Sequence, residues 1–149
     1  MSLAAIRSQI KVVLEGVAGM GKVYDYSPYA LTKSKWESLF LAGGRLHFWS
    51  ITRERTAERP FASGQVERAH GMLIRAFYAL DEDAASPSEK TFQDLLEAAA
   101  SALRSSPTLN GAAESSGPPQ VRLVDWRLFS DVLCHYAEMA LEVREEVSV

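Results

Sequence analysis

The sequence predicts an α+β domain in which an antiparallel β-sheet carries helices packed on one face and contains a long central β-hairpin. Helix-like and strand-like segments follow one another in the order α-β-α-β-β-α-β-β. Neighbouring strands are joined by links of hairpin length, whereas a doubly wound parallel sheet would need more crossover helices. The chain has 149 residues, 47% hydrophobic and 23% charged, so we expect a single domain over residues 1–149.

The N-terminal third contains two predicted helices and a short strand. Apolar side chains recur every three or four positions over residues 2–16, which is typical of an amphipathic helix. A short strand is expected over Lys22–Tyr26, and Ser27-Pro28 then bends the chain. Thr32 is the predicted N-cap of a second, short helix that ends at Gly43-Gly44.

The middle of the sequence predicts the long hairpin. Residues alternate in strand fashion from Arg45 to Arg53, with aromatic and β-branched side chains on both faces. Residues 54–65 are expected to form a polar connector containing Pro60, and Val66–Leu80 to form the second long strand. The two strands should therefore pair as a hairpin with an extended tip.

The C-terminal half begins with a turn-rich link over Asp81–Pro87. Residues Ser88 to Arg104 form the longest predicted helix, with one continuous apolar stripe. The Ser-, Pro- and Gly-rich segment over about 105–119 is expected to be a mobile surface loop within the domain. Two further antiparallel strands are predicted over Gln120–Phe129 and Asp131–Arg144.

Composition excludes several classes of protein. Lys and Arg number 16 against 19 Asp and Glu, a net charge of -3, which argues against general coating of nucleic acid. The single cysteine, Cys134, can form neither an intramolecular disulfide nor a Cys-rich zinc site, as suits a reducing compartment. The apolar runs are too short for a signal peptide or a membrane span, so no membrane partner is expected.

One segment has the spacing of a phosphate-binding loop. Residues 16–22 read GVAGMGK, but Val23 stands where a Ser or Thr hydroxyl would hold magnesium. The segment also follows a helix and precedes a strand, the reverse of the order that the motif requires. We interpret its glycines as a helix stop. A small ligand- or nucleotide-binding α+β domain that uses the Gly16–Lys22 loop remains the alternative from a different functional class.

The residue types that usually carry catalysis are scattered. His47, His70 and His135 each fall in a predicted strand, where isolated histidines are most often hydrogen-bonded structural residues. Adjacent strand residues point to opposite faces, so Cys134 and His135 should not act as a pair. We therefore predict no catalytic residues, no metal site, no cofactor and no enzyme activity.

Charged residues of both signs surround the tip of the predicted hairpin. Such alternation is typical of a solvated face, but it also suits a protruding arm that docks on a neighbouring copy. Phe61 is an apolar side chain among polar neighbours, and an exposed tryptophan among Trp36, Trp49 and Trp126 would likewise indicate an interface. The hypothetical subunit interface comprises Arg53, Arg55, Glu58, Arg59, Pro60, Phe61 and Arg68.

The succession of segments resembles a family of small tail-region proteins of tailed bacteriophages and prophages, of the Mu-like and siphophage type. The likeness covers most of the chain in order and rests on the succession of segments. These segments are Val23–Tyr26 (VYDY) ahead of a helix with Trp36, Arg45–Arg55 (RLHFWSITRER), Glu67–His70 (ERAH), Ile74–Tyr78 (IRAFY), Ser88–Phe92 (SEKTF), Pro119–Val121 (PQV) and Phe129–Glu138 (FSDVLCHYAE).

The resemblance implies a tail terminator or tail completion protein. Such α+β subunits assemble as a ring, commonly a hexamer, at the head-proximal end of the tail tube and join it to the neck. The implied partners are further copies of the chain, the tail tube protein and neck or connector proteins, with DNA only as cargo passing through the lumen. The implied location is the virion, and the host cytoplasm during assembly. A head–tail connector or neck adaptor role is the alternative within the same class.

Overall fold

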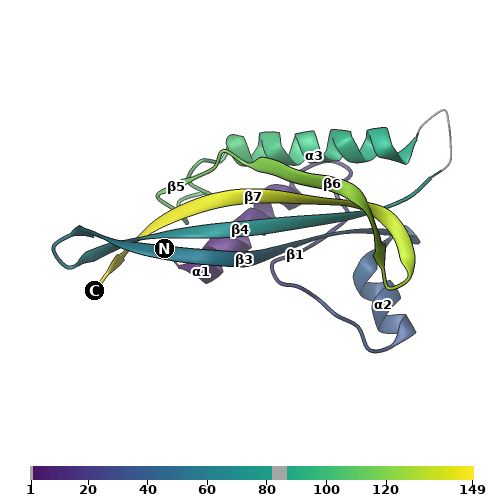
Figure 1. Cartoon of the computed structure of the whole chain (residues 1–149), viewed down its shortest axis with the longest axis horizontal. Coiled ribbons are helices and arrows are strands. Elements are labelled where there is room, and N and C mark those ends of the chain that lie inside the picture. The colour runs from purple at the N-terminus through teal and green to yellow at the C-terminus, as the bar shows by residue number, and fades with distance from the viewer. Residues whose placement is uncertain (1, 82–86) are drawn as a thin grey trace.

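The computed structural model describes residues 2–81 and 87–149, and in this part of the chain it has the predicted α+β architecture (Figure 1). No helix among these residues is long and apolar enough to cross a membrane. The helices are α1 (Leu3–Glu15), α2 (Lys33–Phe40) and α3 (Ser88–Arg104). The strands are β1 (Lys22–Tyr24), β2 (Leu41–Ala42), β3 (Arg45–Ala62), β4 (Gln65–Ala79), β5 (Ser115–Ser116), β6 (Gln120–Phe129) and β7 (Val132–Ser148).

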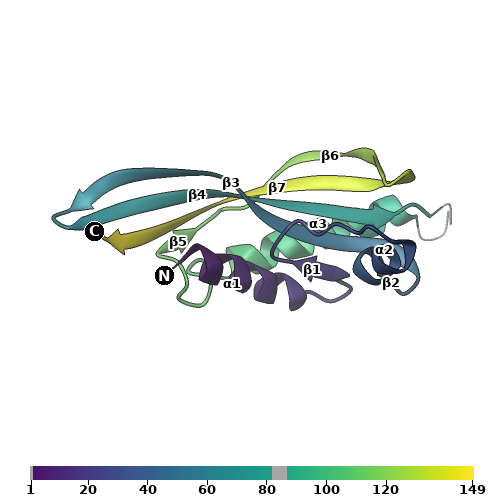
Figure 2. The same cartoon turned by 90° about the horizontal axis from the view of Figure 1, so that it is seen from below.

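All of these strands join one twisted sheet. Its order is β1-β3-β4-β7-β5, with β2 added to β3 and β6 added to β7. Every pairing is antiparallel except that of β1 with β3, which is parallel. The long strands β3, β4 and β7 continue past the helices as a three-stranded projection, which we call the arm (Figures 1 and 2).

The arm corrects the expected polar connector over residues 54–65. Strand β3 continues to Ala62, β4 begins at Gln65, and only Ser63-Gly64 forms the turn. Gly64 has φ +75, a conformation that glycine adopts without steric cost. The sequence interpretation was wrong because cross-strand pairing satisfies the backbone whatever the side chains are, and here both faces of the ribbon meet solvent. Bulges at Arg53/Arg55 and Pro60/Ala62 accommodate the irregular positions.

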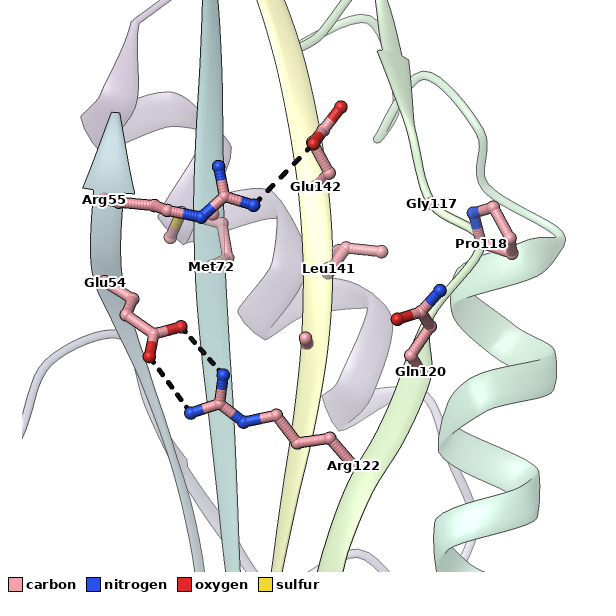
Figure 3. Close-up of a pocket in the computed structure, with 11 residues that line it drawn as sticks. Glu54, Arg55, Met72, Gly117, Pro118, Gln120, Arg122, Leu141 and Glu142 are labelled. Carbon is pink, nitrogen blue, oxygen red and sulfur yellow. Dashed lines mark hydrogen bonds and ion pairs between the residues drawn. The ribbon is translucent and has the colours of Figure 1, made fainter. Parts of the chain in front are cut away.

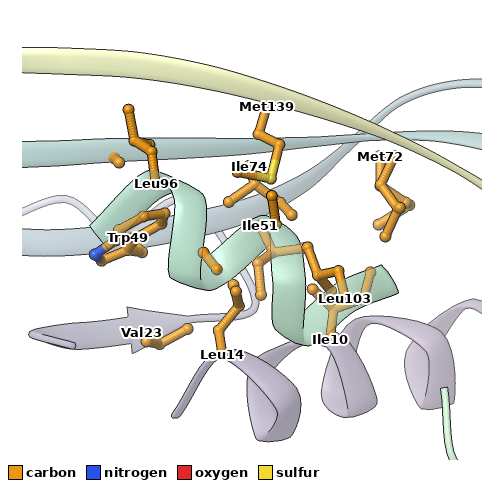
Figure 4. Close-up of a cluster of buried hydrophobic side chains, with 14 of the residues drawn as sticks. Ile10, Leu14, Val23, Trp49, Ile51, Met72, Ile74, Leu96, Leu103 and Met139 are labelled. Atoms are coloured by element: carbon orange, nitrogen blue, oxygen red, sulfur yellow. The ribbon is translucent and has the colours of Figure 1, made fainter. Parts of the chain in front are cut away.

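The main core lies between the sheet and helices α1 and α3 (Figure 4). Strand residues of one parity, such as Trp49, Ile51 and Ile74, meet the apolar stripes of the two helices. Each such side chain contributes roughly 1.5–3 kcal/mol by burial. The labelled members of this cluster in Figure 4 are Ile10, Leu14, Val23, Trp49, Ile51, Met72, Ile74, Leu96, Leu103 and Met139.

Helix α2 departs from the expectation that the helices pack on one face. It contributes Phe40 to a second, aromatic cluster built on the opposite parity of the sheet. Phe48 stacks on Phe77 with ring centroids 4.4 Å apart, and Phe129 closes the cluster from β6. Since Phe48 and Trp49 are successive residues of β3, they point to opposite faces. Helices α1 and α3 therefore share one face, and α2 covers one end of the other.

Helix starts agree with the sequence signals, but several ends do not. Helix α2 ends at Phe40, not at Gly43-Gly44, because Leu41–Ala42 forms β2, a strand that was not predicted. The Ser2 hydroxyl accepts a hydrogen bond from the Ala5 amide at 3.1 Å, and Thr32 is the N-cap of α2 as predicted. Strand β7 runs four residues past its predicted end at Arg144, to Ser148, because it pairs with β4 along the whole arm. The link expected over Asp81–Pro87 lies largely outside the described residues.

The segment after α3 has more contacts than its composition indicated. It forms turns and the short strand β5, and the Glu114 amide donates to the Arg144 carbonyl at 2.9 Å. Leu109 is fully buried, and Ala112 and Ala113 are buried beside it. Residues 105–119 are therefore not only a surface loop, since they supply a buried face, and their mobility stays a prediction.

Candidate functional site

The predicted interface residues lie on the arm, and most of their charges are paired within it. Arg59 donates to Glu67 across the hairpin at 2.8 Å, and Arg55 lies 3.9 Å from Glu142 of β7. Arg53 bonds the Thr56 hydroxyl at 3.4 Å and forms no ion pair with any residue that the structure describes. The surface of the arm is thus a mixed and largely neutralised one.

Phe61 is the exception on this polar surface. Its side chain is 51% exposed next to the turn of the arm, beside Pro60. An aromatic ring in this position gains little in the isolated subunit, because no core residue packs on it. The arm therefore presents one apolar anchor at its tip.

Arg68 differs from the other predicted interface residues, since it points toward a buried cluster at the root of the arm. Its guanidinium contacts Glu58 at 3.0 Å and the fully buried Glu145 at 3.2 Å. His70, also fully buried, lies 3.4 Å from Glu145 through Nε2 and shares a 2.8 Å hydrogen bond with Thr56 through Nδ1. These contacts fix the register of the three strands where they leave the core.

Sequence reasoning missed Glu145, although a signal was present. Leu141 and Val143 set the buried parity of β7, and the next residue of that parity is Glu145. A carboxylate on a buried row requires a partner on the neighbouring strand. Its partner in the register is Arg68 of β4.

The opposite face of the sheet carries a polar groove of about 400 Å³ between the arm strands and β6 (Figure 3). Glu54 accepts two hydrogen bonds from Arg122, at 3.0 and 3.1 Å, across β4 and β7. Both residues sit at register shifts, Glu54 in β3 and Arg122 in β6. The two bulges therefore turn the Glu54 carboxylate and the Arg122 guanidinium toward one another over the sheet.

A chain of hydrogen bonds extends this pairing toward the aromatic cluster. Arg122 also bonds Glu138 at 3.1 Å, and the Tyr136 hydroxyl donates to the same carboxylate at 2.5 Å. The Tyr136 hydroxyl and Arg122 hold the pKa of Glu138 below its ordinary value. Burial raises the pKa of Tyr136. Because each charge in the groove has a partner, the groove is better suited to fixing β6 than to binding a charged ligand.

A second exposed apolar surface lies on β6 and the start of β7. We call it the apolar row, and it comprises Val121, Val124, Trp126 and Leu128 of β6 with Leu133 of β7. Trp126 and Leu128 are each 65% exposed, and the other three are 40% (Val121), 42% (Val124) and 46% (Leu133) exposed. Trp126 is thus the exposed tryptophan that the sequence analysis associated with an interface.

The row lies on the face that α3 covers, but β6 extends beyond the helix. Val124 pairs with Ala137, which belongs to the main core, and Trp126 pairs with His135. A shallow groove of about 240 Å³ runs between α3 and β6, with Glu89 and Asp125 at its rim. The surface is therefore an apolar strip bordered by acids along a free strand edge.

The glycine-rich segment before β1 has a packing role in the structure. A Cβ on Gly21 would lie 2.5 Å from the ring and backbone of His47, so the close approach requires glycine. The Lys22 ammonium donates to the Ser38 carbonyl of α2. The order is helix, loop and strand, as predicted.

The three histidines lie in separate hydrogen-bonded settings. His47 accepts from the Trp49 indole at 3.1 Å, and His135 bonds the Ser88 hydroxyl at 2.8 Å. His70 belongs to the cluster at the root of the arm. Cys134 lies in the aromatic cluster, away from the face of His135, and burial raises the pKa of its thiol to about 11. Within residues 2–81 and 87–149, no three metal-ligating side chains converge.

The geometry as a whole favours contact with macromolecules. Among the described residues, the exposed apolar side chains include Phe61 at the tip of the arm, the apolar row, and Tyr29 and Leu31 ahead of α2. No protein-family model matches the sequence, and a search of curated proteins finds no similar one.

Proposed function

We propose that this chain is a structural subunit of the tail of a tailed bacteriophage, a terminator or completion protein that forms a ring at the head-proximal end of the tail tube. The succession of sequence segments described above supports this proposal through its resemblance to that family. The α+β domain agrees with it.

The observation that carries the proposal is that an extended arm projects from one end of the sheet and an apolar row lies toward the other end (Figures 1 and 2). A subunit of a closed ring contacts two neighbours through two different surfaces. An elongated chain with one unsatisfied surface toward each end meets this requirement. A stand-alone ligand-binding domain would instead concentrate its unsatisfied groups around one cavity.

The proposed partners follow from this role. Further copies form the ring, the tail tube protein meets one of its faces, and neck or connector proteins meet the other. DNA passes through the lumen as cargo, and the net charge of -3 is compatible with passage without strong binding.

The test begins with the mass of the assembled species. We expect native mass spectrometry at rising concentration to show one discrete closed oligomer, a hexamer by the family resemblance. Labelled protein in tails imaged by electron microscopy should mark the head-proximal end of the tube. A label on the connector would favour the neck adaptor role, and a protein that stays monomeric and unattached to tails would contradict the proposal.

The same preparation tests the nucleotide-binding alternative. Addition of ATP or GTP should leave the thermal unfolding midpoint unchanged, and Lys22→Ala should still assemble. A nucleotide-dependent rise of several degrees that disappears in Lys22→Ala would favour the alternative.

A further inference from the structure

Strand β6 combines an apolar row with an unpaired backbone edge. It is 10 residues long and pairs with β7 on one side only. Natural sheets protect such edges with prolines, charged side chains, bulges or a covering element, because an exposed edge accepts further strands. Strand β6 has a bulge at Arg122 and charges at Asp125 and Arg127. Strand β6 contains neither proline nor lysine, and two of its side chains, Trp126 and Leu128, are 65% exposed.

The arm offers a second free edge of similar length, which Pro60 and the bulges at Arg53/Arg55 and Pro60/Ala62 interrupt. Strands β1 and β2 cover positions 45, 46 and 48–50 of β3, whereas residues 53–62 pair with β4 alone. The chain direction alternates through β3, β4, β7 and β6. A neighbouring copy in the same orientation therefore brings its β3 antiparallel to β6, which continues the alternation of the sheet.

The end groups of the two edges agree with this direction. In an antiparallel alignment of residues 53–62 with β6, Arg53 comes toward Asp131 in the β6–β7 turn. Phe61 comes toward Val121 at the other end. Arg53 and Asp131 form no ion pair within the part of the chain that the structure describes, and Phe61 and Val121 are 51% and 40% exposed. In the register that places Phe61 opposite Val121, Arg53 is a diagonal neighbour of Asp131, whereas Arg55 comes opposite Arg127 and Glu58 opposite Val124, so the match is confined to the two ends of the edges.

The two edges cannot meet within one molecule. They form opposite lateral edges of the sheet, and the tip of the arm is at the end remote from the β6–β7 turn (Figure 1). We infer that β6 and the apolar row receive the β3 arm of a second copy, which adds to the sheet as an antiparallel strand. The contact is heterologous, so each copy is donor and acceptor at once. This inference rests on the proposed function for its biological setting, but its test is made in solution.

Two complementary variants test the contact. In the arm variant, Asn-Gly replaces Thr56–His70 and joins Arg55 to its cross-strand partner Gly71, so the donor is absent and the row is intact; Phe61→Glu is a milder form. In the row variant, Trp126→Glu and Leu128→Glu leave the donor intact and disable the acceptor. We expect each variant alone to have monomer mass, and a 1:1 mixture to give a heterodimer that grows no further.

Leu31→Glu is the matched control, because Leu31 is 90% exposed but lies outside both edges. This variant should assemble as the wild type does. Circular dichroism and urea unfolding confirm that each variant is folded before its mass is measured. If the arm deletion does not fold, Phe61→Glu replaces it in the mixture.

The outcomes separate this inference from the proposed function. If the arm variant alone dimerises, the contact is between two rows, and our inference is wrong while a ring can still form by another route. If both variants assemble normally, neither edge is the contact. If the mixture behaves as expected but wild-type protein never attaches to tails, the contact stands and the proposed tail role fails.

Discussion

His47 is the residue whose protonation is most strongly opposed by the fold. Its ring is buried against the backbone of Gly21 and accepts a hydrogen bond from Trp49. Burial lowers its pKa from 6.5 to about 4. The folded protein therefore keeps this imidazole neutral at pH values where the unfolded chain would protonate it.

This shift predicts a loss of stability in mild acid. Between pH 6.5 and 4 the unfolded chain binds a proton that the folded chain does not, so the free energy of unfolding falls as the pH falls. The shift corresponds to about 3 kcal/mol across that window. Urea unfolding should show that the free energy of unfolding falls less between pH 7 and pH 4.5 in His47→Gln than in the wild type. The glutamine can still accept a hydrogen bond from Trp49. An equal difference in both proteins would place the acid sensitivity elsewhere, and His135→Gln is the second variant to examine.

Glu145 should matter more to stability than the nearby, partly buried Glu67. Glu145 is fully buried against Arg68 and His70, so Glu145→Gln weakens charged contacts that solvent cannot replace. We expect a loss of about 1.5–3 kcal/mol in the free energy of unfolding. Glu67→Gln, which weakens pairs with the exposed guanidinium groups of Arg59 and Arg144, is the matched control and should cost less because solvent reaches those two partners. Equal losses would show that the buried cluster does not fix the root of the arm.

The segment between α3 and β6 gives a prediction about a whole element. Leu109 is fully buried in turns that its composition did not mark as packed. Leu109→Ala should lower the free energy of unfolding by about 2–4 kcal/mol, since it leaves a cavity. Leu31→Ala, at a 90% exposed position, should change it little. A neutral Leu109→Ala would support the original expectation that this segment is loosely held.

Periodic segments of the sequence predicted their elements well. The apolar stripe of α3 and the alternation of β6 gave bounds that the structure reproduces, and Thr32 was identified as a cap. These signals succeed because each element buries one face and the side chains record which one. The arm has no alternation of apolar and polar residues, since both of its faces meet solvent. Its sequence was therefore interpreted as a connector.

The candidate surfaces were predicted only in part. Phe61 was predicted as an interface residue because an aromatic side chain among charged neighbours is evident from the sequence alone. The apolar row was not, because Trp126 and Leu128 alternate as in any half-buried strand, and only the position of α3 shows that they are uncovered. Likewise the partnership of Glu54 with Arg122 depends on two bulges far apart in the chain.

The whole molecule is elongated, and this has a measurable consequence. Strand β3 has 18 residues, which span about 60 Å at the usual rise per residue. A compact chain of 149 residues would have a radius of gyration of about 15 Å. Small-angle X-ray scattering at low concentration should give a clearly larger value, and replacement of Thr56–His70 by Asn-Gly should reduce it. A wild-type value near 15 Å would mean that the arm does not project in solution.

The continuity of β3, β4 and β7 from core to tip also determines how the subunit would bear load. Hydrogen bonds between antiparallel strands lie perpendicular to the strands. Tension along the arm therefore shears many of them together, whereas a sideways pull at the turn would peel them one after another. The buried contacts of Arg68 with Glu145 stand at the point where such tension enters the core. An arm of this construction resists tension along its strands and yields more easily to a force across them.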